Sequence, residues 1–402
     1  MIVKERYDVV IIGGAVMGSA TAYFLVSNPA FDGSVLVVER DPSYSKSSTA
    51  LSSGSIRNQF SSPVNVRIGQ FGVAFIRAFA ETMEVDGSRP ELHFHESGYL
   101  FLAATNEQAA ALRENHDVQR ALGVDVELLL PSDLQAAFPH LRVNDLKLAS
   151  YGRSGEGWFS ATALMDGFRK KARQLGADLL VDEVVGIGRR GNRVTEVSLK
   201  SGSRIPCGFI VNATGPRAAR TSEMAGLIVP VEARKRTTFL FDCANSPEGS
   251  ANVNNGRLPL MIDLSGTYCR PDGRLFMAGT NPASDPPVDF DDFEPRHEEF
   301  DRIWTHLAKR SRGFEAIKMA GMWAGHYDFN ALDQNAIVGP HSVVSNFIFA
   351  NGFSGHGLQQ SPAVGRGISE LIAYGRYRTL DLGALGHERF AMGEPLPEKA
   401  VI

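Results

Sequence analysis

Near its start the chain reads YDVVIIGGAVMGSATAYFL (Tyr7–Leu25), in which an apolar run passes through clustered glycines into a helical pattern. Val9–Ile12 is a run of β-branched residues, which predicts a buried parallel strand. We expect a helix to begin near Val16, so that its N-terminal amides face the turn, as in sites that bind a pyrophosphate. The residues expected to hold phosphate are Gly13, Gly14, Ala15, Val16, Met17 and Gly18.

The middle glycine of the usual G-x-G-x-x-G pattern is replaced by Ala15, whose added methyl group still lets a phosphate approach. A second strand is expected over Val35–Val38, and Glu39 and Arg40 follow it. An acid about 20–25 residues beyond the turn is where such sites hold a ribose hydroxyl pair. Strand, turn, helix, strand and acid in this order predict a dinucleotide-binding unit with Glu39 and Arg40 among its cofactor contacts.

The composition fits a large globular protein. With 402 residues and 43% hydrophobic content, the chain can form two domains or one large domain with an insertion. The formal net charge is −4, and the densest basic run is only Arg234–Arg236, so no nucleic-acid partner is expected. The three cysteines, Cys207, Cys243 and Cys269, are far apart, which predicts neither a disulfide framework nor a metal site.

Targeting signals are not evident in the sequence. No apolar run reaches the length that spans a membrane, and the chain starts almost directly on its first predicted strand. That start leaves no room for a signal peptide, so we expect a cytoplasmic protein.

The pattern of elements changes along the chain. Strands and helices alternate near both ends, whereas strands with glycine and proline punctuation dominate from Val229 to Thr280. Helices are expected at 64–79, 107–122, 164–175, 296–309 and 362–374, and strands at 92–94, 99–103, 178–181, 194–199, 209–212, 236–242, 258–263, 266–270, 274–278 and 347–350. The stretch 281–295 is expected to be a surface connection.

This interleaving predicts an α/β protein with two discontinuous domains. A doubly wound dinucleotide-binding domain is expected from residues 1–88, 150–228 and 325–402. An α+β substrate domain on a mixed, largely antiparallel sheet is expected from residues 89–149 and 229–324.

Three further segments are candidates for cofactor contact. A loop rich in serine and threonine runs from Ser43 to Ser55 and precedes Arg57, the strand Val211–Gly215 ends in small residues, and a glycine-rich loop, Gly352–Gly357, leads into a helix. A helix that starts after such a loop stabilises negative charge at its N-terminus. The cofactor contacts expected from these segments and from Val184 are Ser48, Thr49, Ser52, Ser53, Gly54, Ile56, Arg57, Val184, Ala213, Thr214, Gly215, Gly352, Phe353, Ser354, Gly355, His356, Gly357, Leu358 and Gln359.

In this order, and over almost the full chain, these motifs resemble the D-amino-acid oxidase and sarcosine oxidase superfamily of FAD-dependent oxidoreductases. The C-terminal third, with Trp323–Gly325, Asp333–Gly339, GFSGHGLQQ and GEPLPEKAVI, most resembles the branch named FAD-dependent oxidoreductase domain-containing protein 1. The resemblance implies a doubly wound FAD domain, topped by a sheet that encloses the substrate. It also implies that a C–N bond of an amino acid or secondary amine is oxidised by hydride transfer to the flavin N5.

Departures from the superfamily narrow this expectation. Ala324 stands where sarcosine oxidases attach the flavin through a cysteine, so we expect non-covalent FAD. Met277 aligns with a lysine that speeds the reaction with dioxygen, which favours a dehydrogenase that passes electrons to a quinone or carrier protein. Phe60 and Gln359 replace the clamp for the substrate carboxylate, which favours N-substituted amino acids over simple sarcosine.

The resemblance and the residue types together give candidate site residues. Catalytic candidates are Arg57, Tyr268, His326, His356 and Gln359, and substrate-binding candidates are Phe60, Arg270, Met277, Trp323 and Tyr327. Each also has a structural interpretation: Tyr268, Trp323 and Tyr327 as packing residues, Arg270 and His326 as surface residues, and His356 as a histidine hydrogen-bonded within its loop. Arg236 fits a surface residue better than an anion contact.

Two other functions stay open at this point. The superfamily also oxidises C–O bonds, so a 2-hydroxy-acid or polyol dehydrogenase is possible, with His326 or His356 as the base. The branch also includes assembly factors for respiratory complexes, which suggests a non-catalytic FAD protein with protein partners. An NAD(P) enzyme is disfavoured because the chain has a single dinucleotide turn.

Overall fold

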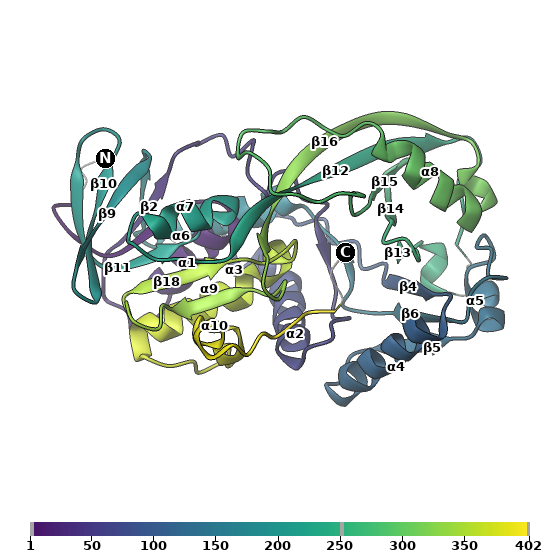
Figure 1. The fold of residues 1–402 in the computed structure, drawn as a ribbon, viewed down its shortest axis with the longest axis horizontal. Helices are drawn as coiled ribbons and strands as arrows, with labels where there is room; N and C mark the ends of the chain where they lie inside the picture. Colours follow the sequence, from purple (N-terminus) through teal and green to yellow (C-terminus); the bar gives the residue numbers. More distant parts are fainter. Residues whose placement is uncertain (1–3, 250–252, 400–402) are drawn as a thin grey trace.

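The computed structural model describes residues 4–249 and 253–399, and Figure 1 shows two sheets side by side with helices around them. Ala400–Ile402, the end of the stretch GEPLPEKAVI, lies outside the described residues, as do residues 1–3 and 250–252. The long strands β12 (Val231–Cys243) and β16 (Ile317–Asn330) arch across the top of the view from one sheet to the far side of the other.

The first sheet has eight strands, with the central path β17-β18-β11-β1-β2-β8 and with β10 and β9 continuing from β11. Its central strand β1 (Tyr7–Ile12) pairs in parallel with β2 (Val35–Glu39) and β11 (Arg204–Asn212). Ile12 is opposite both Val38 and Asn212, so the three strands end at the same level. The other strands are β8 (Asp178–Val181), β9 (Val184–Arg190), β10 (Arg193–Leu199), β17 (Ile337–Pro340) and β18 (Phe347–Asn351).

Both faces of this sheet are buried, which explains the continuous apolar runs. Val9 and Ile11 pack in one core with helices α1 (Val16–Val26), α6 (Ala161–Gln174) and α9 (Gly357–Tyr374). Val10 and Ile12 pack in a second core under β9, β10 and α7 (Ala218–Glu223). Because successive strand residues point to opposite faces, a strand covered on both sides needs an apolar residue at every position.

The second sheet also has eight strands, in the order β16-β12-β15-β14-β13-β4-β6-β5. The strand pairs within it are antiparallel except that of β13 with β4, which confirms the expected mixed, largely antiparallel sheet. Helices α4 (Asn106–Ala121), α5 (Pro131–Ala137) and α8 (Glu299–Arg310) accompany it. Its remaining strands are β4 (Tyr99–Ala103), β5 (Val126–Leu129), β6 (Leu148–Gly152), β13 (Leu260–Ile262), β14 (Tyr268–Asp272) and β15 (Leu275–Gly279).

The two sheets draw on interleaved parts of the chain, as expected from the alternating patterns. The strands of the first sheet fall in 1–88, 150–228 and 325–402. In the second sheet, β6 and β16 extend across the expected boundaries near residues 150 and 325. The exact domain boundaries stay a prediction.

Two expected elements differ in the structure. Leu92–Phe94 is not a strand; only the adjacent His95 forms a bridge, with Trp158. The helix expected from Pro362 begins five residues earlier, as α9 at Gly357, with Pro362 inside it. Proline leaves the carbonyl of Leu358 without its backbone donor, and the Ser361 hydroxyl donates to that carbonyl at 2.9 Å.

Smaller elements complete the fold. A two-stranded sheet pairs β3 (Ser55–Ile56) with β7 (Gly157–Trp158), next to α2 (Pro63–Arg77). The remaining helices are α3 (Phe79–Thr82) and α10 (Glu388–Met392). Among residues 4–249 and 253–399, no helix has both the length and the apolar character that crossing a membrane requires.

Candidate functional site

A cavity opens at the carboxyl ends of β1, β2 and β11 and continues to the face of β12, β14 and β16. This is the edge of a doubly wound sheet at which ligands bind. The predicted site residues that line the cavity are Gly13, Ala15, Val16, Met17, Glu39, Arg40, Ser48, Thr49, Ser52, Ser53, Arg57, Val184, Ala213, Thr214, Gly215, Tyr268, His326, Tyr327, Phe353, Ser354, Gly355, His356, Gly357, Leu358 and Gln359.

The glycine turn is packed so closely that side chains are excluded from it. Gly13 has φ = +95°, and a Cβ there would lie 2.5 Å from the carbonyl oxygen of Ala213. A Cβ on Gly18 would lie 1.9 Å from the carbonyl oxygen of Gly13, so Gly18 sets the contact between helix and strand. The Gly14 amide donates to a carboxylate oxygen of Glu39 at 2.7 Å. The turn therefore fixes α1 directly against the carboxyl end of β1.

The N-terminus of α1 suits an anion. Ala15 is its N-cap and provides no capping side chain, while the Thr49 hydroxyl accepts from the amide of Val16, the first residue of the helix. Its first turn holds no acidic residue, and Ala15, Val16 and Met17 line the cavity. A helix start of this kind presents backbone donors and the positive end of its dipole to a ligand.

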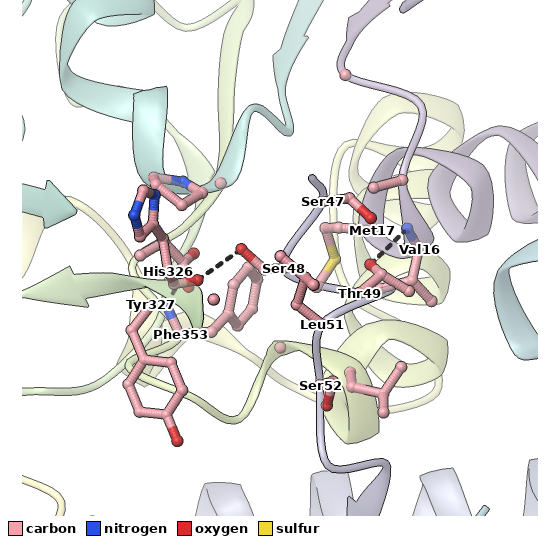
Figure 2. A pocket seen from close by; sticks show the side chains of 18 of the residues that line it. Val16, Met17, Ser47, Ser48, Thr49, Leu51, Ser52, His326, Tyr327 and Phe353 are labelled. Atoms are coloured by element: carbon pink, nitrogen blue, oxygen red, sulfur yellow. Dashed lines mark hydrogen bonds between the residues drawn. The ribbon is translucent and has the colours of Figure 1, made fainter. Parts of the chain in front are cut away.

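The loop rich in serine and threonine crosses the cavity, as Figure 2 shows for Ser47–Ser52. Thr49 Oγ1 accepts from the Val16 amide at 3.3 Å, and the Ser48 hydroxyl donates to the His326 carbonyl at 2.7 Å. The loop therefore connects the start of α1 to β16, and so the first sheet to the second. Ser48, Thr49, Ser52 and Ser53 lie in the lining, consistent with the expected cofactor contact.

The glycine-rich loop Gly352–Gly357 forms another wall. Ser354 has φ = +49° and Gly355 has φ = +96°, and a Cβ on Gly355 would lie 2.6 Å from the Tyr327 ring. Asp328 accepts the Phe353 amide through Oδ2 at 3.2 Å and the Ser354 amide through its carbonyl at 3.1 Å. The loop delivers Gly357, the first residue of α9, to the cavity.

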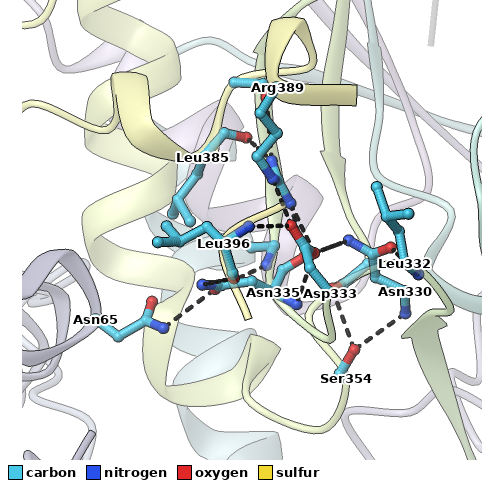
Figure 3. Close-up of polar contacts among 12 residues, drawn as sticks. Asn65, Asn330, Leu332, Asp333, Asn335, Ser354, Leu385, Arg389 and Leu396 are labelled. Atoms are coloured by element: carbon cyan, nitrogen blue, oxygen red, sulfur yellow. Dashed lines mark hydrogen bonds and ion pairs between the residues drawn. The ribbon is translucent and has the colours of Figure 1, made fainter. Parts of the chain in front are cut away.

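A buried polar network holds this loop from behind (Figure 3). Ser354 Oγ accepts from the Asn330 amide at 3.0 Å, and Asn330 Nδ2 donates to Asp333 at 2.7 Å. Asp333 and Arg389, which are 3% and 5% exposed, form an ion pair at 2.7 Å. These hydrogen bonds and this ion pair are shielded from water. The network therefore holds Ser354 in its left-handed backbone conformation.

The contribution of Asp328 to the stability of this wall is expected to depend on pH. Burial raises the pKa of its carboxyl group to about 7, so the folded protein binds that proton more tightly than the unfolded chain. Stability from this proton is fully present below the usual pKa and is lost as pH rises through about 7. Asp328→Asn removes the effect, so we expect its melting temperature relative to wild type to rise by about 2–4 °C between roughly pH 5 and 8. Thermal melts at both pH values test this, and an equal difference at both would contradict it.

Arg57 and His356 form a buried pair on the cavity wall. Arg57 Nη2 lies 2.8 Å from His356 Nε2, and the two residues are 2% and 9% exposed. Since a guanidinium can only donate, Nε2 must be the acceptor and the imidazole is neutral. Burial and then the Arg57 charge lower the pKa of His356 to about 3. The lone pair of His356 is thereby committed to Arg57.

Two further predicted residues contact this pair, and Tyr268 lies elsewhere in the same lining. Gln359 Oε1 accepts from the Arg57 amide at 2.8 Å. Phe60 lies behind the lining, with its ring 4.6 Å from the Arg57 guanidinium and edge-on to His356. Tyr268 shares a 3.4 Å contact with Thr238, and burial raises its pKa to about 12, so it stays a hydroxyl donor.

Several predicted residues do not line the cavity. Arg270 pairs with Asp272 at 2.8 Å and donates to the Ser53 carbonyl at 2.8 Å, and it lines a separate, open pocket. Trp323 Nε1 donates to the Leu51 carbonyl at 3.0 Å and so braces the loop. The predicted site residues that do not line the cavity are Gly14, Gly18, Gly54, Ile56, Phe60, Arg270, Met277, Trp323 and Gly352.

The segment 281–295 corrects an expectation, because it contributes to the cavity and is more than a surface connection. Asn281, Phe290 and Phe293 lie in the lining. Asp285 binds Arg236 through both oxygens at 2.6 and 2.8 Å. These contacts seat the segment across β12.

Further contacts secure the other end of this segment. Asp292 pairs with Lys235 at 2.7 Å, and its carbonyl accepts from His326 Nε2 at 2.7 Å. The Phe293 ring stacks on His326 at 4.4 Å between centroids. The match between the run DFDDF and the basic run Arg234–Arg236 was the signal in the sequence that could have indicated this contact.

Arg217 is a lining residue to which the sequence assigned no role. Its guanidinium lies 4.7 Å from the centre of the Phe290 ring and 3.2 Å from Asp291. It follows the strand β11, at the same edge of the sheet as Glu39 and Arg40. A cationic side chain at this edge is suited to a phosphate-bearing ligand.

The residues present fit FAD. A helix start whose N-cap residue has no capping side chain, a glycine turn without space for a Cβ and an acid at the end of β2 match the parts of a dinucleotide site. A second helix start, at Gly357, lies in the same lining. These features come from three separate parts of the sequence and meet in one cavity.

Comparisons with known proteins agree with this site. The family described as "FAD dependent oxidoreductase" matches residues 8–371. FAD-dependent oxidoreductase domain-containing protein 1 of Xenopus laevis is 40% identical, over 99% of this chain and 85% of that protein. The solved structure of L-proline dehydrogenase from P. horikoshii is 26% identical with a TM-score of 0.85, covering 98% of this chain and 100% of that chain.

Glycine oxidase from Geobacillus kaustophilus has the same fold, with a TM-score of 0.78 at 22% identity over 95% of this chain and 98% of that chain. These similarities confirm the resemblance, the fold class and the cofactor expected from the sequence. Given the family match over most of its length and the close full-length relatives, this chain belongs to the FAD-dependent oxidoreductase family.

Proposed function

We propose that this protein oxidises the C–N bond of an amino acid or N-substituted amino acid and holds its FAD without a covalent link. The observation that carries this proposal is the wall of the cavity formed by Arg57, His356, Tyr268 and Tyr327. It offers a guanidinium and two phenol hydroxyls, while its histidine has no lone pair to spare. Such a wall can bind and orient an amino acid in its neutral amine form without withdrawing a proton from it.

Each residue then has a defined role. Tyr268 and Tyr327 bind the amine or carboxylate by hydrogen bonds, since burial raises the pKa of both phenols and keeps them protonated. The substrate binds as its neutral amine, so no general base is required. FAD held in this cavity would supply the oxidant that accepts a hydride from the carbon next to the nitrogen, and water would then hydrolyse the imine that is released. The N-terminus of α9 stabilises the negative charge that reduction brings.

Two solved relatives support an amino-acid substrate by their names, L-proline dehydrogenase and glycine oxidase. We propose a dehydrogenase that passes electrons to a quinone or carrier protein, since Met277 supplies no cation to assist dioxygen. Met277 is 6% exposed and lies behind the lining, next to Leu240 and Arg270 in the sheet. Ala324, also buried, offers no atom for a covalent tether.

Oxidation of a hydroxy acid would need a base. His356 is committed to Arg57, which leaves His326 as the candidate of the two histidines proposed from the sequence. His326 donates through Nε2 to the Asp292 carbonyl, so its Nδ1 carries the lone pair. His326 is therefore the base to test for this alternative.

Anaerobic mixing of the purified flavoprotein with candidate substrates tests the proposal. The panel comprises N-methyl and N-carboxyalkyl amino acids, D- and L-amino acids and 2-hydroxy acids, with flavin absorbance as the measurement. We expect an amine to bleach the flavin and slow recolouring when air is admitted. Bleaching by hydroxy acids alone would transfer the assignment to C–O oxidation, and a flavin that no compound reduces would favour the non-catalytic partner-binding function.

A further inference from the structure

Glu156 is a buried acid beside the site that none of the sequence motifs included. It lies in the turn between β6 and β7, and it is 0% exposed. A Cβ on Gly152 would lie 2.0 Å from its Oε2 atom, so the carboxyl group is enclosed without spare space. A fully buried carboxyl group is costly unless it is bound by donors.

The donors come from the two residues that follow Arg57. Glu156 Oε1 accepts from the amides of Asn58 at 2.7 Å and Gln59 at 3.1 Å. Its Oε2 accepts from Gln59 Nε2 at 2.8 Å. One carboxyl group therefore fixes the backbone immediately after the cavity-lining arginine.

The partner side chain is itself held in one orientation. Gln59 Nε2 also donates to the Tyr99 carbonyl at 3.1 Å, and Gln59 Oε1 accepts from the Ser150 hydroxyl at 2.7 Å. The amide group of Gln59 consequently presents a donor to Glu156 and cannot turn without losing these bonds.

Arg57 is held from its other side by the closing loop and α9. Its amide donates to Gln359 and its guanidinium to His356, both at 2.8 Å. Glu156 supplies the third constraint, because it fixes the backbone of Asn58 and Gln59 directly after Arg57. Three constraints from distant segments leave the guanidinium one position on the cavity wall.

We propose that Glu156 is a positioning residue, which sets the Arg57 guanidinium against the reacting side of the cavity by binding the amides of Asn58 and Gln59. It touches neither cofactor nor substrate, since it does not line the cavity. The proposal rests on the proposed function only in taking the Arg57 side of the cavity as the side where the reaction occurs.

The charge environment adds a dependence on pH. Burial raises the pKa of Glu156 to about 7, while Gln59, the two amides and Arg57 act in the opposite direction. The other titratable groups that interact with it electrostatically are Tyr99 on β4 and Tyr151 on β6. When the carboxyl group is protonated, one oxygen becomes a donor that faces another donor, so Arg57 loses its exact position.

Glu156→Gln tests the proposal because it keeps size and removes one acceptor, placing an amide nitrogen against Gln59 Nε2. We expect flavin reduction by an amine about 100-fold slower than in wild type, since small displacements at a reacting centre have effects of that order. Because protonation of the amine substrate slows both proteins equally, the test is the ratio of their rates: we expect the rate of wild type relative to the variant to fall as pH falls through about 7. Glu114→Gln, at an exposed position on α4, is the control.

A readout without substrate separates this proposal from the proposed function. Sulfite titration of the bound flavin reports on positive charge near its reactive face, and we expect affinity for sulfite at pH 8 to fall about 10-fold, or ~1.4 kcal/mol, in Glu156→Gln. The double variant Glu156→Gln with Gln59→Glu exchanges donor and acceptor between the two side chains and is expected to recover part of the loss, because the new carboxylate cannot donate to the Tyr99 carbonyl as Gln59 Nε2 does. Wild-type sulfite affinity in Glu156→Gln, or loss of FAD from that variant, would overturn the positioning role.

Discussion

Replacing Gly13 with alanine is expected to weaken FAD binding strongly. The position has φ = +95°, which costs an alanine about 1–2 kcal/mol, and its new methyl carbon would lie 2.5 Å from the Ala213 carbonyl oxygen. That oxygen belongs to the backbone next to β11 and cannot turn aside. The turn must open, and the amides at the start of α1 then no longer point into the cavity. We expect FAD affinity to fall at least about 100-fold, or ~2.7 kcal/mol.

The measurement is the ratio of flavin to protein absorbance after purification, together with a titration of the protein with FAD. Gly321→Ala is the matched control, because a Cβ at Gly321 meets nothing within 4 Å. If Gly13→Ala retained FAD as firmly as Gly321→Ala, the glycine turn would not be the phosphate-binding element.

Replacing Arg57 with methionine is expected to slow flavin reduction by about 10²–10³-fold while FAD stays bound, the range for loss of one pre-aligned donor at a reacting centre. Methionine keeps most of the apolar stem of the side chain but loses the guanidinium contact with the Phe60 ring. It removes the guanidinium that lines the cavity and binds His356. The pKa of His356 should rise from about 3, since the Arg57 charge is the second cause of its depression.

Anaerobic stopped-flow with the substrate identified by the panel measures the reduction rate directly. Arg67→Met, on the exposed side of α2, controls for loss of a positive charge. Arg57→Lys should be intermediate, because it keeps the charge without the planar donor pair. A reduction rate in Arg57→Met equal to that of the control would show that Arg57 has only a structural role.

Much of the fold was readable from local patterns. The β-branched runs of β1 and β2 predicted strands buried on both faces, and the two cores on either side of Val9–Ile12 confirm this. The long helix α4 and the strand β4 were found close to their true bounds. The strand predicted at Leu92–Phe94 was wrong, since two apolar residues on either side of one polar residue do not reveal whether a neighbouring strand is available for pairing.

The candidate site was predicted unevenly. Turn residues such as Gly13 and Gly355 were found because their backbone conformation demands glycine, a requirement that is local. Arg270 was expected to contact substrate, yet it points to Asp272 and a separate pocket. Strand periodicity places side chains on alternate faces, but it does not say which face meets the cavity.

By itself, the sequence determined the dinucleotide turn, the acid at the end of β2 and the glycine-rich loop before α9, because each depends on steric and hydrogen-bonding rules within a few residues. Only the tertiary structure decided that Arg57 meets His356, which is 299 positions away. Only the tertiary structure also decided that Glu156 binds the backbone after Arg57, across 98 positions. It likewise decided that the segment 281–295 lies across β12. Such contacts arise from the packing of two sheets against one cavity, and that packing follows from burial summed over the whole chain rather than from any one motif.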